Sequence, residues 1–71
     1  QSLACLQGWP DLDPAKLNPN GGALAIGHPL GASGGRVVGR AAHALRQRGG
    51  GVAVAALCIG VGQGLAVVLE R

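Results

Sequence analysis

Residues 33–69 read SGGRVVGRAAHALRQRGGGVAVAALCIGVGQGLAVVL, and this stretch decides the fold. Apolar residues recur at helical spacing over residues 33–48, with arginine, histidine and glutamine on the opposite face, which predicts one amphipathic helix. We expect Ser33 to cap its start. The glycines at 49–51 predict its end, because glycine readily adopts the left-handed conformation that closes a helix.

Two uninterrupted apolar runs follow this helix. Residues 52–59 read VAVAALCI and residues 65–69 read LAVVL, and continuous apolar runs are typical of strands buried on both faces. The link at 60–64, GVGQG, is short enough for an antiparallel hairpin. Upstream, residues 23–26, ALAI, form a further short strand candidate. The predicted element order is therefore β-α-β-β, which belongs to the α/β class.

The beginning of the chain is less regular. Residues 1–6, QSLACL, are compatible with the end of a helix, and residues 8–22 contain three of the four prolines, which predicts a surface loop. We therefore divide the chain into a helix tail with a loop over residues 1–20 and a core over residues 21–71.

The composition limits what the chain can be. It has 71 residues, no Phe, Tyr or Met and one Trp, so its core has only small and branched aliphatic side chains. We therefore expect a fragment of a larger protein. Two cysteines are too few for a disulfide framework, and neither a membrane span nor a signal peptide is recognisable. We expect free thiols, a cytoplasmic location and no membrane partner.

Charged residues give little evidence of a nucleic-acid or metal site. The net charge of +3 owes much to four arginines within residues 36–48, which a solvated helix face explains. A single aromatic residue provides no platform on which bases could stack, so we expect no nucleic-acid partner. The only carboxylates are Asp11, Asp13 and Glu70, which do not predict an acid/base pair. We expect no metal site.

The candidates for chemistry are His28 and Cys58, each beside glycines at the end of a predicted strand. Both have structural alternatives, a hydrogen-bonded histidine and a small buried thiol. Bare backbone at Gly60 could bring an amide N–H within reach of a substrate oxygen, as an oxyanion hole requires. Glycine-rich residues 31–35 open a helix, which leaves a small anion-binding module as an alternative. We assign His43, on the polar helix face, no role.

Two motifs resemble those of the thiolase family. Residues 20–34, NGGALAIGHPLGASG, resemble the thiolase stretch that ends in GHPxGxSG, and residues 58–64, CIGVGQG, are similar to the closing CxGxGxG motif. The resemblance implies part of a thiolase C-terminal domain from a protein several times longer, with mixed sheets and helices in duplicated halves. Val61 and residues 18–20 resemble more closely the thiolases that handle 3-oxoadipyl-CoA and related β-ketoacyl-CoAs.

The resemblance also implies roles for individual residues. Thiolases are acyltransferases of fatty acid or aromatic catabolism that cleave or join coenzyme A thioesters by Claisen chemistry on two cysteines and a histidine. By resemblance, His28 takes the proton of the acyl-accepting cysteine and helps to bind the thioester oxygen. Cys58 moves the proton on the α-carbon of the second acyl-CoA, and Gly60 contributes its amide to the second oxyanion site.

The chain departs from the family pattern in two ways. The acyl-accepting cysteine belongs to the N-terminal half of thiolases and is absent here, since Cys5 lies in a helix tail without a glycine-rich setting. The asparagine motif that positions a catalytic water is also missing. We therefore expect the chain alone to be inactive. A fragment of a ketoacyl synthase-type condensing enzyme remains an alternative. We expect acyl-CoA and CoA as substrates, no resident cofactor and a homo-oligomeric parent.

Overall fold

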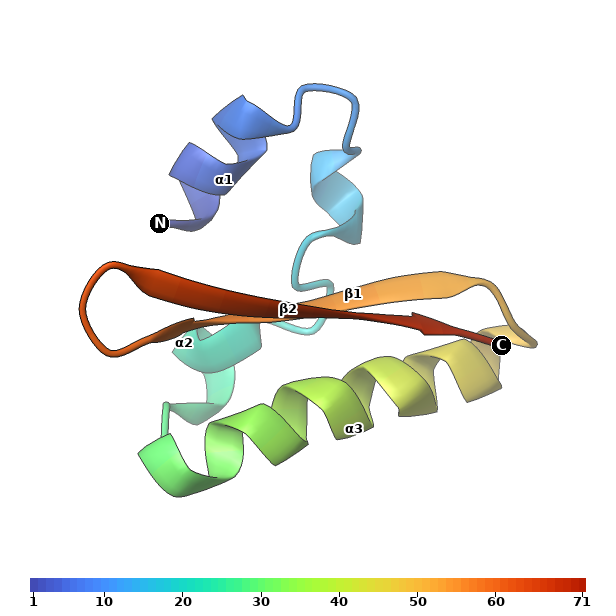
Figure 1. The fold of residues 1–71 in the computed structure, drawn as a ribbon. Coiled ribbons are helices and arrows are strands. Elements are labelled where there is room, and N and C mark those ends of the chain that lie inside the picture. The colour runs from blue at the N-terminus through green and yellow to red at the C-terminus, as the bar shows by residue number, and fades with distance from the viewer.

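The computed structural model describes all residues, 1–71, and shows one helix packed along a two-stranded hairpin (Figure 1). In chain order the elements are α1 (Ser2–Gly8), the 3-10 helix η1 (Pro14–Lys16), α2 (Gly22–Ile26), α3 (Leu30–Arg48), β1 (Val52–Ile59) and β2 (Gln63–Glu70). The combination of helices with a small antiparallel sheet is consistent with the α/β class.

The two strands form the antiparallel hairpin that the sequence predicts. Their register runs from Val52 opposite Glu70 to Ile59 opposite Gln63. Strand β2 begins two residues before the predicted start at residue 65, because Gln63 and Gly64 still pair with the end of β1. The connecting turn is therefore short, and Gly60 and Gly62 take positive φ values of 53° and 69° within it.

Helix α3 ends at the predicted residue but begins earlier. Gly49 is left-handed at φ 82°, and the N–H of Gly50 bonds the carbonyl of Leu45, which closes the helix after Arg48. The prediction that Ser33 caps the start is wrong, since Pro29 occupies the N-cap position and Leu30 is the first helical residue. A proline has no N–H to leave unpaired at a helix start, so the helix can begin directly behind it.

The predicted strand at residues 23–26 is also wrong, because Gly22–Ile26 form the short helix α2. Ala and Leu are strong helix formers, and the fold offers this segment no strand with which to pair. Gly21 and Gly27, at φ 94° and 77°, end the helix on either side. No strand precedes α3, so the predicted β-α-β-β order is wrong at its first element.

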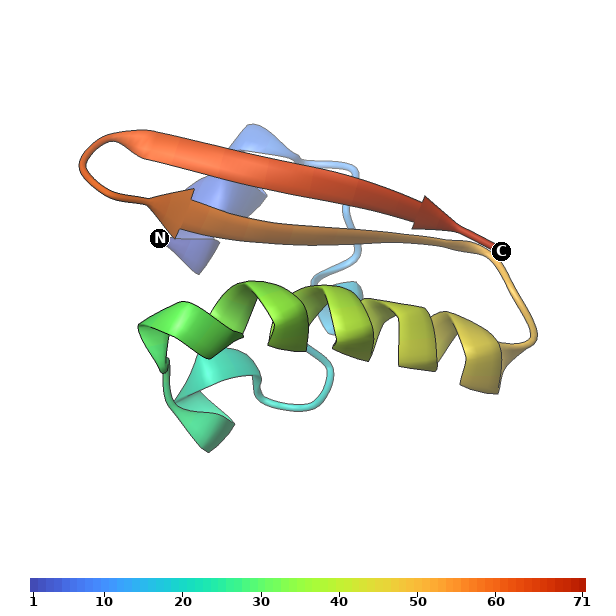
Figure 2. The ribbon, with the colours of Figure 1, turned by 60° about the horizontal axis from the view of Figure 1, so that its bottom comes forward.

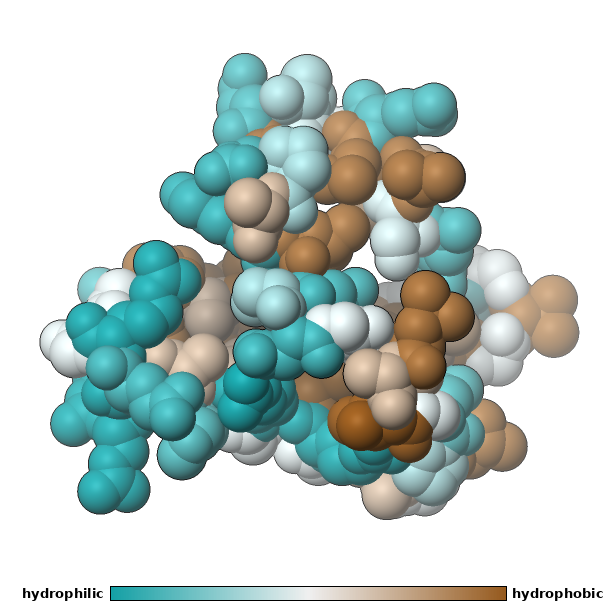
Figure 3. Space-filling view, turned by 180° about the vertical axis from the view of Figure 1, so that it is seen from behind, coloured by the Kyte–Doolittle hydropathy of each residue, from teal (hydrophilic) through white to brown (hydrophobic).

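Helix α3 covers one face of the hairpin and leaves the other open (Figures 1 and 2). Leu45 of the helix and Ala55 of β1 are the only buried apolar residues. On the opposite face, Val54 and Val68 pair with each other and are 48% and 67% exposed. The prediction that both faces of the strands are buried therefore fails in this structure, and apolar side chains reach its surface (Figure 3).

In the N-terminal arm, residues 1–20, neither α1 nor η1 packs substantially against the hairpin or α3. It contains α1, which agrees with the predicted helix tail, and a loop interrupted by η1. The Asp13 side chain caps η1 by accepting a hydrogen bond of 3.0 Å from the backbone N–H of Ala15. None of the helices has the length and apolar character that crossing a membrane requires.

Candidate active site

His28 lies in the short connection between α2 and α3 rather than at the end of a strand. Gly27 before it has a φ of 77° that side-chain-bearing residues rarely adopt, and Pro29 after it disfavours helical geometry at His28. The backbone is therefore turned sharply on one side and restricted on the other. As a result the imidazole is presented, exposed, beside the first turn of α3.

Two side chains of α3 hold this connection in place. Ser33 Oγ lies 2.5 Å from His28 Nδ1 and also donates to the carbonyl of Pro29 at 3.1 Å. One turn later, the Arg36 guanidinium donates to the carbonyl of Ile26 at 3.1 Å and approaches that of Gly27 at 3.5 Å. The ring and the backbone before it are thus both attached to the start of α3.

The three residues proposed for chemistry line the same hollow. This hollow, of about 380 Å³, lies between the start of α3 and the turn end of the hairpin. His28 contributes from the α2–α3 connection, and Cys58 and Gly60 contribute from the end of β1 and the turn. The remaining lining is largely aliphatic: Leu30, Val37, Val38, Ala55, Ala56, Leu57, Ile59, Leu65 and Val67, with Gly34. Segments thirty residues apart therefore meet at one place.

Cys58 is a free, exposed thiol. The alternative of a small buried hydrophobe therefore does not apply in this structure. Side chains alternate along a strand, so Cys58 shares the open face of the hairpin with Val54 and Ala56. Its partner across the hairpin is Gly64, which has no side chain to cover it. No hydrogen bond links Cys58 to His28, so each is available to a reactant.

The hollow is lined by the His28 imidazole and by glycine backbone, and Cys58, which contributes to the lining, presents its thiol on the open face at the same end of the hairpin. An imidazole and a thiol can each carry a proton, and a bare backbone N–H can donate to an oxygen that gains negative charge. Carboxylates contribute nothing here, since Asp11 and Asp13 lie in the N-terminal arm. The structure contains no cluster of three metal-ligating side chains. Proton transfer beside an oxyanion is therefore the chemistry that these groups can perform.

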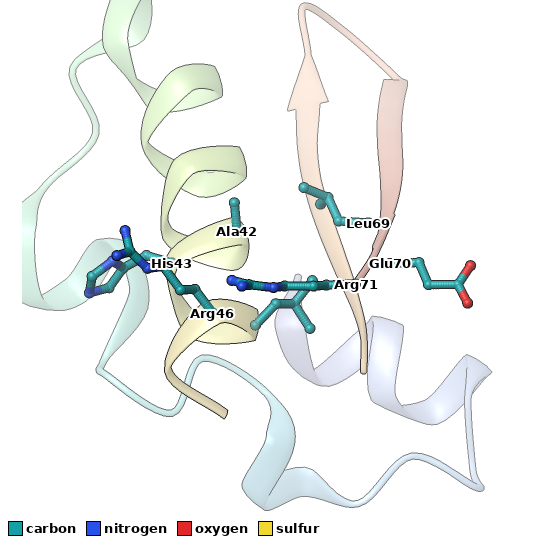
Figure 4. A pocket seen from close by; sticks show the side chains of 7 residues that line it. Ala42, His43, Arg46, Leu69, Glu70 and Arg71 are labelled. Carbon is teal, nitrogen blue, oxygen red and sulfur yellow. The ribbon is translucent and has the colours of Figure 1, made fainter. Parts of the chain in front are cut away.

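A second hollow lies at the other end of α3. Arg71 extends into the space between helix and strand, Glu70 points away from it, and Arg46 lies beside His43 on the side of the helix away from the strands (Figure 4). Positive charge near a helix C-terminus offsets the helix dipole. This interaction explains the position of Arg46 in the last turn of α3, and no ligand is needed to explain it. His43 is exposed on the same side, in agreement with the prediction of a solvated residue.

Cys5 lies in α1, exposed and outside both hollows. Its position in a helix agrees with the predicted helix tail. Sequence reasoning missed two residues, Ser33 and Arg36, because it treated them as a helix cap and part of a solvated face. The spacing contained a signal for both residues. Ser33 and Arg36 are three residues apart in α3 and therefore lie on the same side of the helix.

The sequence of the chain was compared with those of known protein families. All residues, 1–71, match the family described as "Thiolase, C-terminal domain". The chain belongs to this thiolase family. The thiolase resemblance of the two motifs is thereby confirmed for the chain as a whole.

Curated thiolases are similar to the chain over most or all of its length. It is 56% identical over 73 residues, covering all of the chain, to the beta-ketoadipyl-CoA thiolase of Acinetobacter baylyi. It is 53% identical over 73 residues to the 3-oxoadipyl-CoA/3-oxo-5,6-dehydrosuberyl-CoA thiolase of Escherichia coli. The mitochondrial 3-ketoacyl-CoA thiolase of Bos taurus is 57% identical over 61 residues, 86% of the chain.

The chain spans only 18% of the length of the first two thiolases and 15% of the third. No solved structure matches the chain.

Proposed function

We propose that the chain supplies the histidine and one of the two cysteines of a thiolase active site within a longer protein. That protein cleaves a 3-oxoacyl-CoA with CoA, or runs the reverse Claisen condensation. One observation carries the proposal: in a chain of the thiolase family, His28, Cys58 and Gly60 line a single hollow. The family match argues against a ketoacyl synthase fragment and a stand-alone anion-binding module.

Each residue has a distinct task in this proposal. In acyl transfer, His28 accepts the proton of an acyl-accepting cysteine located elsewhere in the protein and then donates it toward the thioester oxygen. In condensation, Cys58 removes a proton from the α-carbon of the second acyl-CoA, and the Gly60 amide stabilises the enolate oxygen. Cleavage uses the same groups in the opposite direction. The arrangement needs a thiol and an imidazole but no resident cofactor.

The names of the relatives support a substrate class. Two of the thiolases aligned with the entire chain act, by their names, on ketoadipyl-CoA or 3-oxoadipyl-CoA. We therefore favour a dicarboxylic 3-oxoacyl-CoA, of the kind met in aromatic catabolism, over a fatty 3-ketoacyl-CoA. We also propose a cytoplasmic homo-oligomer whose partners are acyl-CoA and CoA rather than nucleic acid or a membrane.

The two half-reactions test these tasks in the full-length thiolase that contains the chain. Replacing Cys58 with Ala should leave acylation of the enzyme by acetyl-CoA close to wild type while condensation falls by about 10²–10⁴-fold. Replacing His28 with Ala should slow acylation itself. Exposed His43, replaced by Ala, is the matched control and should change neither half-reaction. A folded Cys58→Ala enzyme that cannot be acylated contradicts the task given to Cys58.

The 71-residue chain on its own completes the experiment. It should cleave no acetoacetyl-CoA above a buffer blank, because it lacks the acyl-accepting thiol of the proposal. Turnover by the isolated chain, abolished by a thiol reagent, contradicts the proposal that another part of the protein supplies the nucleophile.

A further inference from the structure

Ser33 is the only buried polar residue of the chain, with 5% of its surface exposed. It lies in the first turn of α3, five residues after His28, and its hydroxyl touches both the imidazole and the carbonyl of Pro29. A polar group placed in one of the few buried positions of an open fold is costly unless its hydrogen bonds are satisfied. The partners of this hydroxyl therefore reveal how the ring beside it is held.

Only one arrangement of hydrogens satisfies both contacts of the Ser33 hydroxyl. A serine hydroxyl has one hydrogen to donate and two lone pairs, whereas the carbonyl of Pro29 can only accept. With the hydroxyl hydrogen on Pro29, the contact between Ser33 Oγ and His28 Nδ1 is satisfied only when Nδ1 carries a hydrogen and donates it. The reverse tautomer takes that hydrogen for Nδ1 and leaves the 3.1 Å contact without one, so that the carbonyl of Pro29 keeps only the backbone N–H groups of Ala32 and Ser33, each at 2.9 Å.

We infer that Ser33 is a positioning residue that keeps the neutral His28 ring protonated on Nδ1 and leaves Nε2 free to accept the thiol proton. This inference rests on the proposed function. In the acylation step the S–H bond of the nucleophile breaks, an Nε2–H bond forms, and the new thiolate attacks the thioester carbon. Nε2–H then faces the oxygen that becomes negative and later returns its proton to the departing CoA thiolate. Throughout, Nδ1–H continues to donate to Ser33 Oγ.

Loss of this hydroxyl should impair acylation more than stability. In Ser33→Ala the ring can rotate and take the other tautomer, in which Nε2 already carries hydrogen and cannot act as a base. We expect acylation of the full-length thiolase by acetyl-CoA to slow by about 10–100-fold, with the change in kcat rather than in KM. Ser33→Thr retains the hydroxyl and should recover most of the rate. Ser2→Ala, at the only other serine and in exposed α1, is the control.

The ring nitrogens provide a readout that a merely structural serine does not move. In wild-type enzyme labelled with nitrogen-15 in its histidine rings, solid-state NMR should show a protonated Nδ1 and a bare Nε2 for His28, assigned with His28→Asn. The reverse pattern overturns the inference, even if Ser33→Ala fails to fold. Wild-type acylation rates in a folded Ser33→Ala enzyme also overturn it. A wild-type enzyme that no acyl-CoA acylates refutes the proposed function instead, while the spectrum still reports the tautomer.

Discussion

Cys58 and Gly64 face each other directly across the hairpin. Because paired residues of an antiparallel sheet project to the same face, the side-chain position beside the thiol is empty. Gly64 has no positive φ, and a Cβ built on it comes no closer than 3.7 Å to the carbonyl oxygen of Leu57. A side chain therefore fits at this position, and its absence leaves the thiol uncovered.

Filling that position should reduce activity without loss of stability. In the full-length thiolase, Gly64→Val should maintain or raise Tm, because valine suits a strand better than glycine does. Its methyl groups should cover the Cys58 thiol and lower the condensation rate and the rate of thiol alkylation, each by about 10-fold. Ala66→Val, one pair along on the same face, is the control. Equal losses in both variants contradict a specific role for the space beside Cys58.

Gly60 and Gly62 form a matched pair for testing the second oxyanion site. Both have positive φ, and a Cβ on either meets no atom within 4 Å, so alanine costs each about 1–2 kcal/mol of strain. Only Gly60 lines the hollow. We expect equal losses of Tm for Gly60→Ala and Gly62→Ala, but an additional loss of condensation of about 10-fold for Gly60→Ala. Identical kinetics in the two variants contradict the assignment of the Gly60 amide.

The sequence predicts those parts of the fold that local chemistry determines. The end of α3 follows from consecutive glycines, and the hairpin follows from two apolar runs with a short glycine link, so the structure agrees with both. The structure also places His28, Cys58 and Gly60, the residues to which the motifs point, along one hollow.

The errors arise where tertiary context decides between local alternatives. Residues 23–26 suit a helix or a strand by composition, and without a partner strand the helix prevails. The start of α3 depends on the backbone conformation at Pro29, which the spacing of apolar residues does not reveal. The same applies to Ser33 and Arg36, whose bonding partners lie in the preceding connection.

Arg36 should matter for activity although it does not line the hollow. In Arg36→Ala the carbonyls of Ile26 and Gly27 lose their donor, which should cost about 1 kcal/mol and loosen the backbone before His28. We expect acylation in the full-length enzyme to fall by about 10-fold, with faster amide hydrogen exchange at residues 27–30. Arg40→Ala, at an exposed arginine of the same helix, should change neither measurement. Unchanged exchange in Arg36→Ala contradicts this role.

The last prediction concerns the 71-residue chain in isolation, which should be marginally stable and self-associating. Its accessible surface is 5601 Å², whereas a compact monomer of its 7.0 kDa mass exposes about 4,000 Å². Only three residues are buried. A core of this size contributes little against the entropy of ordering the chain, and the open face of the hairpin offers apolar side chains to a second copy.

Val54 and Val68, the paired valines of that open face, allow the cause to be tested. Replacing both with Thr preserves their β-branched shape while making the face polar, so sedimentation should show less association with little change in strand content. Val67→Thr, on the face toward α3, is the control and should instead lower stability, because it places a hydroxyl against the helix. A wild-type chain that sediments as a monomer and unfolds cooperatively at micromolar concentration contradicts the prediction. A stable monomer requires a larger hydrophobic core than Leu45 and Ala55 provide.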